Sequence, residues 1–223
     1  MRFILIIPLL FPNLVQGFVP SSACGTNLPN IRLWASAVAK SALESAIDNA
    51  LIAGEDPIPH IERLEATEAA NAQPNRSPDF LGEWYVWWTN CPPPSNGQLG
   101  PFSGTSEQAI DSEGAYVNIL RVPPNDWLKA VLQGVYEDWN GQILSDINTQ
   151  GQTQGSEDWG ACHWKVTFIN LTISLLGIPL IQKEFPPGTS RVWRTTYMAN
   201  NVRIVRAGKT GLPEDEGMLL FEL

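Results

Sequence analysis

The sequence predicts a mainly β protein, in which one or two N-terminal α-helices precede an antiparallel β-barrel. Between residues 33 and 72 the apolar positions recur about once per helical turn, as they do in amphipathic helices. After residue 79 the apolar period falls to two, which is typical of strands. The short strand-like segments are separated by Gly, Pro and Asn, and this spacing indicates a barrel or a sandwich. A barrel is favoured because closure removes exposed edges and can enclose one apolar ligand.

Composition narrows the function classes before any motif is considered. The chain has 223 residues, of which 43% are hydrophobic and 17% charged, so it can bury a core. Its net charge of −9 argues against a nucleic-acid binder, which would present a basic face, and against electrostatic docking on anionic lipid. Three cysteines do not make a disulfide framework. We therefore expect an acidic globular protein that is rich in tryptophan, with nine.

The N-terminus carries the features of a targeting sequence. Residues 1–17 combine a basic Arg2, an apolar stretch and small residues before the expected cleavage site, which predicts a signal peptide. Residues 18–40 contain no acidic residue, as is usual for a plastid transit sequence. The combination resembles the two-part presequence of algae with complex plastids. The alternative is plain secretion, but an odd number of cysteines suits a reducing compartment better.

Residues 41–78 are expected to form the N-terminal helices and a linker. The alanine-rich segment 33–53 has the helical period, and Gly54 is a suitable C-cap. A second helix is predicted over residues 60–72, and a polar linker with two prolines follows at 71–78.

Residues 79–223 are expected to form the barrel. Gly134 is a candidate for a bend or bulge, Asn200 and Asn201 for a hairpin turn, and 140–160 for a long loop. The expected strands are 81–89, 115–121, 128–137, 162–173, 191–199, 202–205 and 217–223.

Strand alternation also predicts which side chains would line the barrel and bind an apolar lipid. These are Trp84, Val86, Trp88, Val117, Ile119, Trp164, Val166, Phe168 and Tyr197.

The first strand opens with Gly82-Glu83-Trp84. Small ligand-carrying barrels often begin with Gly-x-Trp, whose Trp closes one end. A basic side chain from the last strands, either Arg203 or Arg206, is expected to lie on that ring as a cation–π partner. The alternative is a core tryptophan in a barrel without a ligand.

No motif predicts catalysis, a metal or a cofactor. His60 and His163 are not joined by metal-ligand spacing, and Cys91 and Cys162 are expected to be thiols at strand ends. The acidic run 214–216 is expected to be a solvated loop. An enzyme, such as a lipid isomerase, would need at least two acid–base groups in one pocket. The candidates for that role are Tyr116, Tyr136, Glu137, His163 and Tyr197.

Several blocks of the sequence resemble the plastid lipid-associated protein family, also called plastid fibrillins. The segment 61–78 matches the family's Leu-Glu…Pro…Pro lead-in. FLGEWYVWWTN at 80–90 is similar to L-x-G-x-W-x-L-x-Y-T-S. WRTTYM at 193–198, followed by VRIVR at 202–206, is similar to W-L-D-T-T-Y-L-D…L-R-I-x-R-G. The closing LLFEL at 219–223 is similar to a terminal F-V-L.

This resemblance implies a lipocalin-like barrel that binds or coats apolar plastid lipids such as prenylquinones and carotenoids. It also implies a plastid location at plastoglobules, thylakoids or stroma, with peripheral association to membranes or lipid droplets. Some family members act by binding a biosynthetic enzyme, so the alternative is an interaction scaffold with a packed barrel. The chain departs from the family at Ala199, Asn200 and Asn201, which replace acidic residues.

Overall fold

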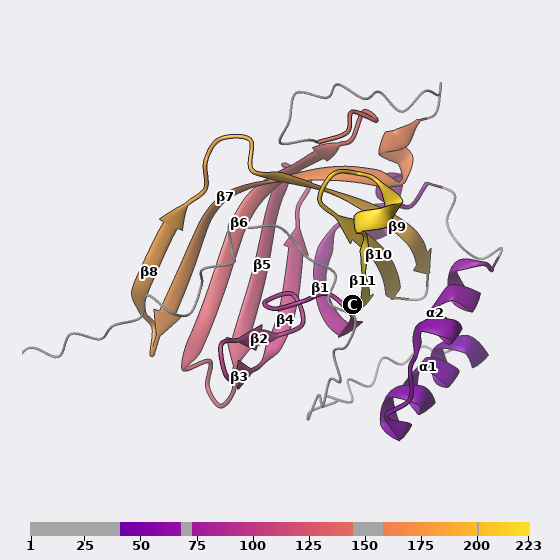
Figure 1. The fold of residues 1–223 in the computed structure, drawn as a ribbon, viewed down its shortest axis with the longest axis horizontal. Helices are drawn as coiled ribbons and strands as arrows, with labels where there is room; N and C mark the ends of the chain where they lie inside the picture. Colours follow the sequence, from indigo (N-terminus) through magenta and orange to yellow (C-terminus); the bar gives the residue numbers. More distant parts are fainter. Residues whose placement is uncertain (1–40, 68–72, 145–157, 200) are drawn as a thin grey trace, which may run out of the picture.

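The computed structural model describes residues 41–67, 73–144, 158–199 and 201–223, and it confirms the predicted fold class. Eight antiparallel strands close a barrel in the order β1, β4, β5, β6, β7, β9, β10, β11 and back to β1. Two helices lie beside one outer side of it (Figure 1). The predicted signal peptide and transit sequence, residues 1–40, lie outside the described residues.

The barrel strands are β1 Gly82–Thr89, β4 Thr105–Ile110, β5 Ala115–Val122, β6 Leu128–Asp138, β7 His163–Leu175, β9 Ser190–Ala199, β10 Val202–Gly208 and β11 Gly217–Glu222. A further strand, β8 Ile178–Glu184, pairs with the second half of β7 and extends the large curved sheet in Figure 1. β2 Gln98–Leu99 and β3 Phe102–Ser103 form a separate small hairpin. All seven expected strands are present, whereas β4, β8 and the short β2 and β3 were not predicted. β4 presents Ser106 and Gln108 to the interior, so it lacks the apolar alternation that marks a strand.

Local sequence explains how the helices begin and end. α1 (Ala42–Ala53) starts at a capping box, in which Ser41 and Glu44 satisfy each other's backbone N–H groups. It ends at Gly54, whose φ of 72° a residue without Cβ adopts easily. α2 (Ile58–Glu65) follows directly and contains a proline in its first turn.

Two helix boundaries differ from the prediction. α2 begins at Ile58 and ends at Glu65, so it is shorter than the expected 60–72. The start expected for the first helix, 33–40, lies outside the described residues.

The helices cover the outer face of β1, β9, β10 and β11. The cluster they bury comprises Ile47, Ile61, Leu64, Trp88, Tyr197, Val202, Ile204, Met218 and Leu220. A half-buried ion pair between Glu65 on α2 and Arg206 on β10 reinforces the contact.

One end of the barrel is closed by the linker that precedes β1. Its two 3₁₀ turns are η1 (Pro74–Arg76) and η2 (Pro78–Phe80). Phe80 is fully buried, with its ring 5.4 Å from that of Trp164. Asn75 accepts a hydrogen bond from Thr195 (3.0 Å). We call this the closed end. At the far end, Leu99 of the β2–β3 hairpin packs with residues of β5, β6 and β7.

Extra residues interrupt the pairing of three barrel strands. They are Trp87 in β1, Ile169 in β7 and Thr196 in β9. Each one changes which side chains face inward beyond it. The bend expected at Gly134 coincides with the β6–β7 irregularity, where a Cβ on Gly134 would lie 2.6 Å from the Thr167 carbonyl oxygen.

Candidate functional site

The inner surface near the closed end is a dense aromatic core. Its buried members include Phe80, Trp84, Ile110, Tyr116, Trp164, Val166, Trp193, Met198, Val205 and Phe221. Of the predicted lining residues, Trp84, Trp164 and Val166 belong to this core, and Val86 and Phe168 pack against it. The rings of Trp164 and Trp193 meet edge to face, with centroids 5.0 Å apart.

The Arg203 guanidinium lies over Trp84 inside this core. Its central carbon is 4.5 Å from the Trp84 ring and 4.5 Å from the Phe221 ring. Arg203 is fully buried, and this burial lowers its pKa to about 9. Arg206, the other expected partner of Trp84, points outward and pairs with Glu65, because alternate residues of β10 face opposite sides.

Polar side chains continue from Arg203 along the inner face. Arg203 Nη2 donates to the side-chain oxygen of Gln108, and Gln108 Nε2 donates to the Tyr116 hydroxyl (3.3 Å). Ser106 donates to Asn118 Oδ1 (3.2 Å). These five residues, from β4, β5 and β10, form what we call the inner polar tract. Burial raises the pKa of Tyr116 far above its usual value, against the opposing influence of Gln108 and Arg203, so its hydroxyl stays neutral.

Beyond this tract the inner surface is accessible to solvent. Asn118, Leu132 and Leu171 are paired side by side across β5, β6 and β7. All three are only partly buried, although they share the inward face with Tyr116 and Ile173, which are buried. Phe168, Leu132 and Leu171 therefore present apolar surface between the aromatic core and the far-end cluster. We call this region, with Asn118, the mid-barrel site.

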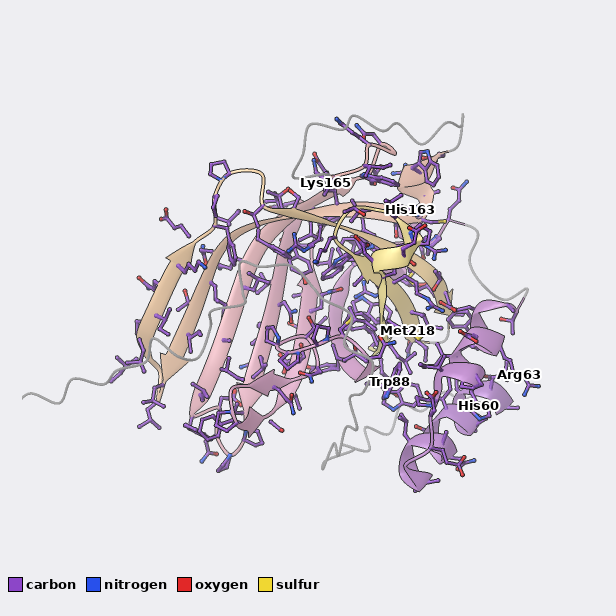
Figure 2. The ribbon with its side chains drawn as sticks, viewed as in Figure 1. His60, Arg63, Trp88, His163, Lys165 and Met218 are labelled. Carbon is purple, nitrogen blue, oxygen red and sulfur yellow. The ribbon has the colours of Figure 1, made fainter. Side chains whose placement is uncertain are left out.

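The prediction that Trp88 lines the barrel is wrong. The extra residue Trp87 shifts the β1–β11 register, so that Val86 is opposite Phe221 and Trp88 is opposite Leu220. Trp88 therefore packs with Met218 in the cluster under the helices. Figure 2 shows both residues on the side of the barrel that faces the helices.

Three further residues are also misplaced by the prediction. Tyr197 belongs to the same outer cluster as Trp88, because the extra residue Thr196 reverses the facing of β9. Val117 and Ile119 lie on the outer face of β5, since their neighbours Tyr116 and Leu120 are the buried, inward ones. The choice failed because alternation alone does not separate the two faces of β5: each is mostly apolar, with Asn118 on the inner face and Arg121 on the outer one.

Of the candidate acid–base residues, Tyr116 and Tyr136 both pack against Trp164 in the aromatic core, whereas the other three lie elsewhere. Tyr116 is enclosed in the core, and Tyr136 donates its hydroxyl hydrogen bond to the Asp111 carbonyl (2.9 Å). Glu137 forms an outer ion pair with Lys165. His163 lies among the rings of Trp139 and Trp159 at the start of β7, far from His60 on α2 (Figure 2). Tyr197, the fifth candidate, lies in the cluster under the helices.

The residues that the structure describes include no group of three or more His, Cys, Asp or Glu side chains placed to hold a metal ion. None of the helices in the same ranges has the length and apolar character that crossing a membrane requires.

Comparison of the chain with protein-family models, with curated proteins and with solved structures finds no significant match.

Proposed function

We propose that this protein is a non-catalytic carrier or coat protein for apolar plastid lipids, of the prenylquinone or carotenoid class. The observation that carries this proposal is the mid-barrel site, where inward-facing apolar side chains remain partly exposed. When a ligand covers such surface, each Å² of apolar area contributes about 25 cal/mol to the free energy of binding, before the costs of association are subtracted. The sequence resemblance to plastid fibrillins supports the lipid class and a plastid location.

Intrinsic tryptophan fluorescence tests this proposal. Trp164 and Trp193 lie in the core beside the site, so a short-chain plastoquinone bound at mid-barrel should quench the emission saturably. Leu132→Trp should fill the site and weaken binding strongly, because a larger side chain occupies the ligand's volume. Val131→Trp is the matched control, since Val131 directly precedes Leu132 in β6 and faces outward opposite Ile119. Equal quenching in the wild type and Leu132→Trp, or none in the wild type, would contradict the proposal.

The proposed location has its own test. We expect the full chain, fused to a C-terminal fluorescent protein and expressed in an alga with a complex plastid, to accumulate in the plastid. Deletion of residues 1–17 should abolish this plastid localisation. Secretion of the full-length fusion would refute the plastid assignment and weaken the lipid class inferred from it.

A second candidate is an interaction scaffold that supports a plastid lipid-biosynthetic enzyme. The exposed apolar side chains of the β7–β8 hairpin favour it, since Leu176 is 74% exposed, Ile178 65% and Leu180 50%. The same surface also suits peripheral attachment to a lipid droplet. Proximity labelling in the algal cell, with the labelling enzyme fused to this protein, distinguishes binding to a protein from attachment to a lipid droplet. If the hairpin binds a biosynthetic enzyme, Ile178→Ser should remove that enzyme from the set of labelled proteins. An unchanged set of labelled proteins contradicts the scaffold.

A further inference from the structure

Arg203 places an uncompensated positive charge inside the barrel. Its side chain is fully buried, and its Nε and Nη1 atoms have no hydrogen-bond partner. Among the described residues no carboxylate forms an ion pair with it; its polar contact is the neutral Gln108. The rings of Trp84 and Phe221 offset part of the burial cost through cation–π attraction. A negative charge that entered the barrel would be attracted to this guanidinium, because screening is weak in a protein interior.

The inner polar tract ends in a hydrogen-bond donor that faces the mid-barrel site. The Oδ1 atom of Asn118 already accepts a hydrogen bond from Ser106, and its amide also hydrogen-bonds to Tyr116, which leaves the second amide N–H as the group available to a ligand. Asn118 is partly exposed, whereas Gln108 and Tyr116 on either side of it are buried. A ligand at mid-barrel therefore meets Asn118 first, with the Arg203–Gln108 pair behind it.

The surroundings of Asn118 are suited to a lipid tail. Leu132 lies opposite it on β6, and Leu171 lies opposite Leu132 on β7. Further along the barrel, the far-end cluster adds Leu120, Val122 and Ile173. The site thus combines one partly exposed donor, a nearby positive charge and apolar side chains that are partly accessible. This combination complements an amphiphile that has one small acceptor group at the end of a long apolar chain.

We propose that the mid-barrel site selects a lipid with a single carboxylate head group over a neutral lipid with the same tail. The carboxylate accepts a hydrogen bond from the Asn118 amide and lies within the field of Arg203. This inference rests on the proposed lipid-binding function and adds to it the chemistry of the preferred head group.

Competition between matched ligands tests the selection. The bound probe is cis-parinaric acid, whose fluorescence rises in an apolar site, and the competitors are oleate and methyl oleate. We expect oleate to displace the probe at about tenfold lower concentration than the ester, because a hydrogen bond to a charged acceptor increases the affinity by about that factor. Asn118→Leu should reduce this ratio toward one, because oleate, the charged and stronger acceptor, loses more affinity than the ester. Asn170→Leu makes the same change at an outward-facing position of β7 and should leave the ratio unaltered.

The outcomes separate this inference from the function on which it rests. Equal displacement by oleate and methyl oleate in the wild type overturns the head-group selection and leaves apolar lipid binding standing. A ratio that survives Asn118→Leu overturns the role of Asn118. If the probe does not bind, and the short-chain plastoquinone does not quench the tryptophans, the lipid-binding function itself fails.

Discussion

Arg203 and Trp84 lie face to face at the closed end of the barrel, with 4.5 Å between the guanidinium carbon and the centroid of the ring. The two residues belong to β10 and β1, which are separated by β11, so their contact ties three neighbouring strands together at the inner face. Trp84 Nε1 also donates to the Phe80 carbonyl oxygen (3.2 Å), which connects this pair to the linker that closes the barrel.

Removing the ring should cost far more stability than removing the charge. Trp84→Ala should lower the free energy of unfolding by about 3–5 kcal/mol, because it leaves a large cavity and exposes the guanidinium to it. Arg203→Met should change it by about 1 kcal/mol or less, since the lost cation–π contact is offset by no longer burying a charge. Urea denaturation of both variants gives the comparison. Similar losses would show that the charge itself stabilises the fold.

The Glu65–Arg206 ion pair should contribute measurably to helix docking. Glu65 accepts hydrogen bonds from two nitrogens of Arg206, and both side chains are half-buried. Glu65→Gln should lower the free energy of unfolding by about 1–2 kcal/mol, because a half-buried arginine loses its charged partner. Glu55→Gln, at an exposed position between the two helices, serves as the control in the same urea titration. An equal effect of both substitutions would argue against a specific pair.

Cys91 should be unreactive until the protein unfolds. Burial raises the pKa of its thiol to about 11, so almost no thiolate is present near neutral pH. Cys162 is half-buried and should be alkylated before Cys91. Iodoacetamide labelling at pH 7.5 with peptide mass mapping resolves the two sites. Rapid labelling of Cys91 in the native protein would contradict its position in the core.

Stability should fall in mild acid because of His163. Burial lowers the pKa of His163 from 6.5 to about 4, and the positive charge of Arg194 acts in the same direction. The unfolded chain binds this proton more readily than the folded protein does. The contribution of neutral His163 to the free energy of unfolding is therefore complete above about pH 6.5 and is lost as the pH falls toward 4. The side chain is partly exposed, so we expect a loss of about 1–2 kcal/mol over this window.

Urea titrations at pH 7.5 and pH 5 measure this dependence. His163→Gln should flatten it, whereas His60→Gln, which changes the other histidine, should retain it. A steep loss in His163→Gln would assign the acid sensitivity to carboxylates instead.

Sequence reasoning identified the barrel and part of its lining, and its errors have a common physical cause. Trp84 and Val86 face inward as predicted, but the same alternation carried one step further places Trp88 on the wrong side. An extra residue at Trp87 breaks the count, and nothing in GEWYVWWT marks its position, because the bulge is fixed by the register against β11. Thr196 has the same effect on Tyr197.

The choice of face in β5 could not be made from the strand alone. Both sets of alternating residues are mostly apolar, and the set with Val117 and Ile119, which also contains Arg121, faces outward. The inner set contains Asn118 because Ser106 on the neighbouring strand satisfies its amide oxygen. The polar strand β4 was missed for the same reason, since Gln108 finds its partners in Tyr116 and Arg203.

The sequence by itself determined the strand-rich class, the helix stop at Gly54 and the pairing of Trp84 with a basic residue from the last strands. These depend on local backbone preferences and on periodicity, which are properties of neighbouring residues. Only the tertiary structure decided that the basic residue is Arg203 and that Trp88 and Tyr197 lie beneath the helices. Those outcomes depend on register between strands that are distant in the chain, where a shift of one residue exchanges the inside of the barrel for the outside.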